Sequence, residues 1–148
     1  DENGLMAALH GLARTTQSTC GIPCEFRCDE PVLVANASTA VHLYRIAQEA
    51  VTNAVRHGQA TGIVLSLEAD GDRATLRIGN DGRPFPAELP KHRGMGLQVM
   101  HYRAEVIGGI LDVHPGPDGG TRVTCVFDGT PQRHEEGRKD AEKSRKQR

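Results

Sequence analysis

Hydrophobic side chains recur along this chain at two different spacings, which separate helices from strands. Residues 4–19 carry apolar side chains at every third or fourth position, which is typical of one face of a helix. The same spacing returns from residue 38 to about residue 57, and again from 96 to 107. Ser38 or Thr39 can cap the second of these helices at its start. The pattern therefore predicts three helices.

Between the helices, apolar and polar residues alternate, which predicts strands that bury one face. The segment 24–28 (CEFRC) is one such strand. Residues 61–80 form two more, joined by a turn at Asp70-Gly71-Asp72, and the segments ILDVH and TRVTCVF form a last pair. Neighbouring strands favour antiparallel hairpins, and long helices must then cover one face of the sheet. We therefore predict an α+β two-layer sandwich and not a doubly wound fold.

Composition limits the classes of protein to consider. The chain has 148 residues, a formal net charge of -1, 3% aromatic residues and no Trp. No basic field or stacking surface therefore points to direct nucleic-acid binding, and no apolar run is long enough for a membrane helix. We expect one folded domain over residues 1–128, cut from a longer protein that begins upstream, and a charged, disordered tail over 129–148. The four cysteines are expected to be reduced thiols of a cytoplasmic protein.

Three polar residues line one side of the second predicted helix. Glu49, Asn53 and His57 stand at i, i+4 and i+8, with Arg45 and Arg56 flanking them. A solvated polar face is the plain alternative. However, Asn is a poor residue for a helix interior. A carboxylate and an amide oxygen one turn apart can share a hard cation.

Two glycine-containing segments offer further ligand contacts. In RGMGLQVM, Gly94 and Gly96 precede a helix start, where free N–H groups favour phosphate, although such glycines are often only a flexible helix entry. In IGNDGRPFP, the Asp81-Gly82 pair resembles a hairpin turn, but the proline-rich segment that follows is no strand. Asp81 can accept a hydrogen bond from an exocyclic amine, and Gly82 lets a flat ring approach the backbone.

In this order, the segments YRIAQEAVTNAVRHG, NDGRPF, GMGLQVM and GGTRVTCVF resemble the ATP-binding catalytic domain of sensor histidine kinases. This domain belongs to the GHKL group, and the similarity is to the subgroup that acts with helix-turn-helix response regulators. The resemblance covers about residues 4–128. It implies the Bergerat fold, a mixed and mostly antiparallel sheet covered on one face by helices, with ATP and Mg2+ as ligands.

The resemblance also implies roles for single residues. Asn53 matches the Asn that holds magnesium, Glu49 matches the catalytic acidic residue, and His57 matches a common basic position of the same helix. Asp81 matches the residue that recognises the adenine amino group, with Gly82 beside it. The second glycine box, which lies at the phosphates in the family, is matched by Gly94, Gly96 and Leu97. Thr121 matches the Thr near the adenine end. Lys91 and Arg93 can reach phosphates from the proline-rich lid, but no motif assigns them.

The chain departs from the family in two ways. Pro84 stands where the second Gly of Asp-x-Gly-x-Gly is expected, which predicts a stiffer lid with one N–H fewer. No histidine has the sequence context of the phosphoacceptor, because His10 precedes Gly11 and His134 lies in the tail.

The function implied is that of a histidine kinase catalytic domain, which presents the γ-phosphate of Mg-ATP to a histidine on separate dimerisation helices. The expected partners are those upstream helices and a response regulator. The expected location is the cytoplasm, including the cytoplasmic part of a membrane-bound sensor. Two alternatives remain open: a degenerate nucleotide-binding or docking module without kinase activity, and a GHKL serine kinase of the anti-sigma type.

Overall fold

A computed structural model describes residues 4–83, 96–117 and 119–131. The described helices are α1 (Gly4–Cys20), α2 (Ala37–Arg56) and α3 (Gly96–Val106). The described strands are β1 (Cys24–Arg27), β2 (Val32–Leu33), β3 (Ile63–Asp70), β4 (Arg73–Asn80), β5 (Ile110–Pro115), β6 (Thr121–Asp128) and β7 (Thr130–Pro131). None of these helices is both long enough and apolar enough to cross a membrane.

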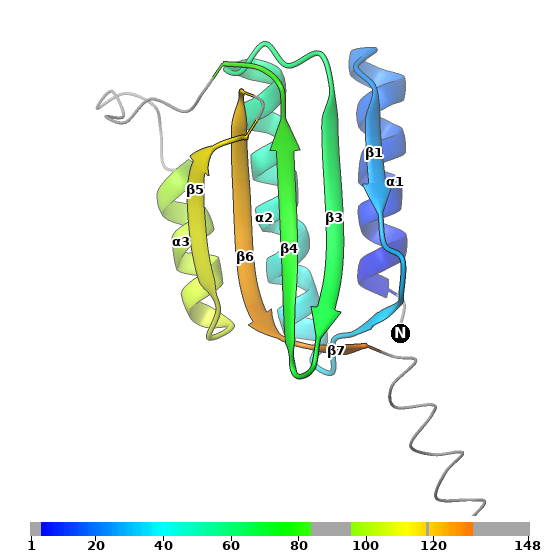
Figure 1. The fold of residues 1–148 in the computed structure, drawn as a ribbon, viewed down its shortest axis with the longest axis vertical. Helices are drawn as coiled ribbons and strands as arrows, with labels where there is room; N and C mark the ends of the chain where they lie inside the picture. The colour runs from blue at the N-terminus through cyan, green and yellow to red at the C-terminus, as the bar shows by residue number, and fades with distance from the viewer. Residues whose placement is uncertain (1–3, 84–95, 118, 132–148) are drawn as a thin grey trace, which may run out of the picture.

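The main sheet has five strands in the order β1-β3-β4-β6-β5. β1 pairs with β3 in parallel, and the other three pairs are antiparallel. All three described helices lie on one face of this sheet, and the other face is open (Figure 1). The predicted α+β two-layer sandwich, with a mixed and mostly antiparallel sheet, is therefore confirmed.

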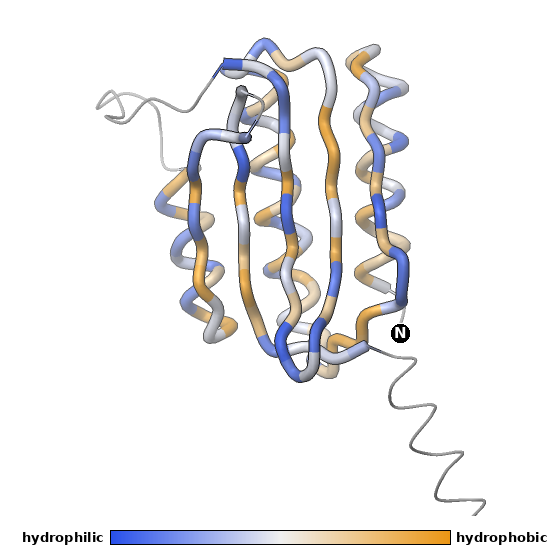
Figure 2. Tube along the Cα trace, viewed as in Figure 1, coloured by the Kyte–Doolittle hydropathy of each residue, from blue (hydrophilic) through white to orange (hydrophobic). Residues whose placement is uncertain are grey.

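The core lies between the sheet and the helices. Alternate residues are buried there over 63–67 of β3, 74–78 of β4 and 121–127 of β6, and the alternation of hydropathy is clearest along β4 (Figure 2). α2 contributes the largest helical share, with Leu43, Ile46 and Ala47 among its buried residues. The four cysteines are free thiols, as predicted, and burial raises the pKa of both Cys24 and Cys125 to about 11.

Two local features differ from the sequence prediction. The cap of α2 is Asn36, whose side-chain oxygen accepts a hydrogen bond from the Ser38 N–H at 2.8 Å, and neither Ser38 nor Thr39 is the cap. β2 and β7 were not predicted, because two-residue strands are too short to show an alternating pattern. β7 pairs with β2, so the ordered chain continues past the predicted boundary at residue 128. The rest of the predicted tail, residues 132–148, lies outside the described residues.

Candidate functional site at the end of the sheet

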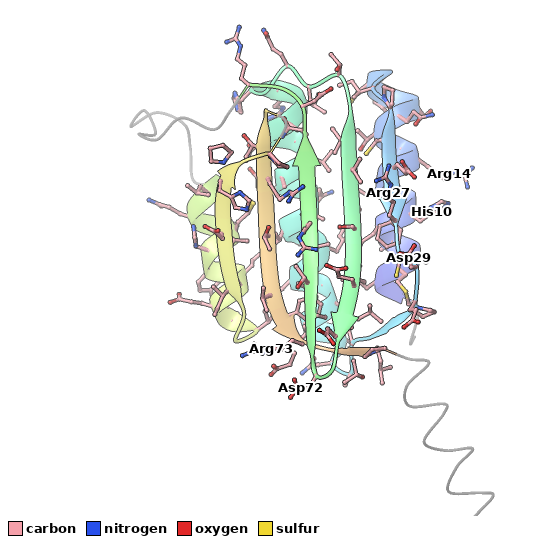
Figure 3. All side chains as sticks on the ribbon, in the orientation of Figure 1. His10, Arg14, Arg27, Asp29, Asp72 and Arg73 are labelled. Carbon is pink, nitrogen blue, oxygen red and sulfur yellow. The ribbon has the colours of Figure 1, made fainter. Side chains whose placement is uncertain are left out.

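The segments that carry the predicted site residues meet at one end of the sandwich. There α2 ends, β4 ends, and β6 and α3 begin, at the top of Figure 1. The β3–β4 turn, with Asp72 and Arg73, lies at the opposite end (Figure 3). The antiparallel order of β4 and β6 accounts for this arrangement, because the end of one strand is beside the start of the other.

Glu49 and Asn53 form a polar pair on α2. Both are half-buried, and neither side chain has a hydrogen bond or ion pair with any other residue that the structure describes. Gly96, the first residue of α3, lies so close that a Cβ added there would overlap the Glu49 carboxylate. Leu97 packs against the core beside it. The structure therefore brings two of the predicted motifs together, and its described part offers no polar partner to these two half-buried side chains.

These oxygens suit a hard cation. Carboxylate and amide oxygens are the ligands that Mg2+ prefers, usually with substrate phosphates and water completing the shell. Within the described ranges, no group of three or more His, Cys, Asp or Glu side chains could hold a metal by itself. Glu49 and Asn53 supply two oxygen ligands of the kind that suits a cation shared with phosphate groups.

Asp81, at the end of β4, is bound to the loop that precedes β3. Its carboxylate accepts hydrogen bonds from the N–H of Thr61 at 2.8 Å and of Gly62 at 2.9 Å, and from the Thr61 hydroxyl at 2.5 Å. The Thr61 hydroxyl and then its N–H are the main causes that hold the Asp81 pKa below its ordinary value. These bonds join two segments about twenty residues apart in the sequence.

This depressed pKa predicts a pH dependence of stability. A carboxyl with a lower pKa in the folded state stabilises the fold above its unfolded pKa, and this contribution disappears as the pH falls through the folded value. Asp81→Asn should therefore unfold at a lower temperature than the wild type at pH 7, and the gap should narrow below about pH 4, the ordinary range of the group. Thermal unfolding across this pH range measures the gap. A gap that stays constant down to about pH 2 would contradict the assignment.

Two glycines allow close approach of the backbone at this end. A Cβ on Gly82 would overlap the carbonyl oxygen of Gly58, just beyond α2, and the next N–H, of Arg83, donates to that oxygen at 2.6 Å. Gly120 has a φ of +72° and lies against the Asn80 carbonyl group in the same manner. Thr121 is buried, and its hydroxyl donates to the Arg83 carbonyl oxygen at 3.3 Å.

The other predicted residues have mixed outcomes. His57 is exposed, and caps the C-terminus of α2 with its N–H donating to the Asn53 carbonyl oxygen. Sequence reasoning missed Thr61 and Gly62, which bind Asp81. In the sequence, their only distinguishing feature is that a polar residue and a glycine directly precede β3. The predictions for Pro84, Lys91, Arg93 and Gly94 lie outside the described residues.

A hollow of about 840 Å3 lies mainly over the open face of the sheet, and its lining includes Asn80, Asp81 and Thr121 at the ends of β4 and β6. Arg27, which lies on β1 in Figure 3, lines it together with Arg77 and Arg122. Arg27 is paired with Glu25 at 3.1 Å, and Arg77 is paired with Glu68. Because two of the three arginines are already neutralised, this hollow is a weaker candidate for an anion site.

Comparison with known proteins decides the family. The model of the histidine kinase-, DNA gyrase B- and HSP90-like ATPases matches residues 38–131. The chain belongs to this ATPase family. The match begins in α2, includes every described site residue and ends with β7.

Curated relatives are sensor proteins. The nitrate/nitrite sensor protein NarX of Escherichia coli K12 is 28% identical over 126 residues, which cover 85% of this chain and 21% of NarX. Sensor protein VraS of Staphylococcus aureus COL is 37% identical over 82 residues, which cover 55% of this chain and 24% of VraS. The chain thus spans about a fifth to a quarter of the length of these relatives.

Solved structures confirm the Bergerat fold of the family. The ATP-binding domain of PrrB from Mycobacterium tuberculosis superimposes with a TM-score of 0.68 at 22% identity, covering 83% of this chain and 92% of that domain. The histidine kinase domain of a blue-light activated kinase from Erythrobacter litoralis has a TM-score of 0.69 at 21% identity, covering 83% of this chain and 60% of that one.

Proposed function

We propose that this family member binds Mg-ATP and is the catalytic domain of a sensor histidine kinase. It would present the γ-phosphate to a histidine on separate dimerisation helices, and a response regulator would then receive the phosphoryl group. The observation that carries the proposal is the half-buried pair of Glu49 and Asn53. Neither side chain has a hydrogen bond or ion pair with another described residue, and Glu49 lies against Gly96 at the start of α3.

The protein's role in such a transfer is to position the phosphates and neutralise charge. Asn53 would hold Mg2+ through its amide oxygen, and Mg2+ would offset the charge of the phosphates. Glu49 would orient water or the attacking group beside it. Gly96, together with Gly94, would let the phosphates approach the start of α3, where backbone N–H groups favour anions. His57, exposed at the end of α2, would contribute only at the margin of the site.

At the base end, the resemblance assigns recognition of the adenine amino group to Asp81, with Gly82 beside it and Thr121 near the adenine end. Gly82 follows the end of β4 and Thr121 begins β6, so both would lie near a base bound at this end of the sheet. Asp81 lies there too, but its three hydrogen bonds direct its carboxylate to Thr61 and Gly62. Its assignment stays a prediction.

The names of the relatives and of the neighbouring structures support the proposal. NarX and VraS are named as sensors, and the neighbouring structures include the full-length kinase ShkA with AMPPNP, which has a TM-score of 0.65 at 20% identity and covers 88% of this chain and 30% of ShkA. We propose a cytoplasmic location on the same grounds.

Calorimetric titration of the full chain with ATP tests the proposal. We expect saturable one-site binding that is tighter with Mg2+ than with EDTA, because the cation bridges the phosphates to Asn53 and Glu49. The kinase step is tested in the parent protein, where incubation with labelled ATP should yield acid-labile phosphohistidine. Absence of nucleotide binding would refute the proposal. Binding without any phosphohistidine would favour the docking-module alternative, and acid-stable phosphoserine on a partner would favour the serine kinase.

A further inference from the structure

Strand alternation places Asn80, and not Asp81, on the helix-covered side of the sheet. Ala74, Leu76 and Ile78 of β4 are buried against the helices, and residue 80 is the next position of that series. Asn80 is half-buried, and its partners across the ladders are Ile63 and Thr121, both of them buried. Its side chain therefore stands on the same side of the sheet as α2, where the polar pair lies.

Asp81 follows the last residue of β4 and is exposed. Its carboxylate accepts three hydrogen bonds from Thr61 and Gly62, which belong to the loop between α2 and β3. A base placed over the end of the sheet would therefore meet residue 80 on the helix side, while Asp81 holds the loop beneath it. Asp81 is in this view a positioning residue.

The orientation of the Asn80 amide follows from its neighbour. Its Oδ1 accepts a hydrogen bond from the Gly82 N–H at 2.9 Å. Since a backbone N–H can only donate, the atom that faces Gly82 must be the oxygen, and the NH2 group points elsewhere. This NH2 group has no acceptor among the described residues. The half-buried side chain thus offers a donor that no described residue engages, at the end of β4.

The Asn80 NH2 group affects which purine bases can form hydrogen bonds at this position. Guanine presents a carbonyl oxygen at position 6, and adenine presents an amino group there with an acceptor nitrogen at position 1. The Asn80 NH2 can donate to either acceptor, and Oδ1 keeps a second lone pair for the adenine amino group. A carboxylate at residue 80 would accept from the adenine amino group but would repel the 6-oxo group of guanine.

We propose that Asn80 contacts the base and makes the nucleotide site tolerant of both 6-amino and 6-oxo purine triphosphates. The inference rests on the proposed nucleotide-binding function and specifies its substrate class: purine nucleoside triphosphates in general, and not adenine alone. A hydrogen-bonded pair at a base edge typically discriminates by about tenfold or more, so an amide in place of a carboxylate has a measurable effect on selectivity.

The test is a titration of the full chain, with Mg2+, against ATP and GTP separately. Wild type should bind GTP within about tenfold of ATP. Asn80→Asp keeps an oxygen for the Gly82 N–H and is nearly the same size, and should raise the preference for ATP over GTP by about tenfold or more. Gln48→Glu is the matched amide-to-carboxyl change outside the proposed site, at a side chain that pairs with Arg45. It should leave the ATP-to-GTP ratio unchanged.

A wild-type preference for ATP above about a hundredfold would overturn the inference, and it needs no variant to measure. So would a ratio that Asn80→Asp leaves unchanged, or one that Gln48→Glu shifts as much as Asn80→Asp does. These outcomes leave the proposed function intact, because ATP still binds. Failure of both nucleotides to bind would overturn the proposed function and this inference with it.

Discussion

Asn53→Ala is expected to weaken Mg-ATP binding by about 10- to 100-fold while making the fold slightly more stable. Loss of an interaction with a charged ligand costs about 1.5–3 kcal/mol, which is the source of this range. Asn53 is half-buried in mid-helix and its side chain bonds to no other described residue, so the folded protein without ligand loses nothing by its removal. Ala is the better helix former by about 0.5 kcal/mol.

Titration calorimetry with and without Mg2+, beside thermal unfolding, measures both effects. Gln48→Ala is the matched control, because it removes an amide from the same helix whose oxygen accepts a hydrogen bond from Arg45 at 2.8 Å. That control should leave Mg-ATP affinity within about twofold, as is usual for a surface change away from a binding site. Equal loss of affinity in both variants, or a clear loss of stability in Asn53→Ala, would contradict the assignment of Asn53 to the ligand.

Gly82→Ala is expected to destabilise the fold by about 1–3 kcal/mol, because the added methyl group would overlap the Gly58 carbonyl oxygen and the backbone must move. The same movement would strain the short hydrogen bond from Arg83 to Gly58 and shift Asn80 and Asp81, so nucleotide binding should weaken as well. Chemical denaturation of the purified variant, followed by far-ultraviolet circular dichroism, gives the free energy of unfolding.

Gly79→Ala, three residues earlier on β4, is the matched control. A Cβ at Gly79 meets no atom within 4 Å, and the strand backbone suits Ala, so we expect no loss of stability and a small gain from the less flexible unfolded chain. Equal loss of stability in the two variants would show that the close contact with Gly58 is not the reason why residue 82 must be a glycine.

Asn53 and Gly82 represent two kinds of constraint at one end of the sheet. Asn53 costs stability in a helix interior, and its side chain makes no hydrogen bond or ion pair with another described residue. The second is required by packing alone. A residue that lowers the stability of the fold and forms no hydrogen bond with the described protein is the more direct indication of a bound ligand.

Much of the fold could be predicted from the sequence, because long elements have periodic patterns. The helices and the strands of the main sheet follow from apolar spacing, and their order favours the sandwich. β2 and β7 could not be predicted, since two residues carry no period. The parallel pairing of β1 with β3 could not be predicted either, because their strand patterns are the same for either direction.

For the site, the sequence determined which residue types were present and in which order: the acidic and amide pair on α2, Asp81-Gly82 and the glycine before α3. It also contained the alternation along Ala74, Leu76 and Ile78 that leads to residue 80. The sequence prediction nevertheless assigned base recognition to the carboxylate of Asp81. Only the tertiary structure decided where Asp81 points, because its donors, Thr61 and Gly62, lie about twenty residues away. Periodicity reports the face of a single element, whereas the partner of a side chain at the end of a strand depends on which loops the fold brings there.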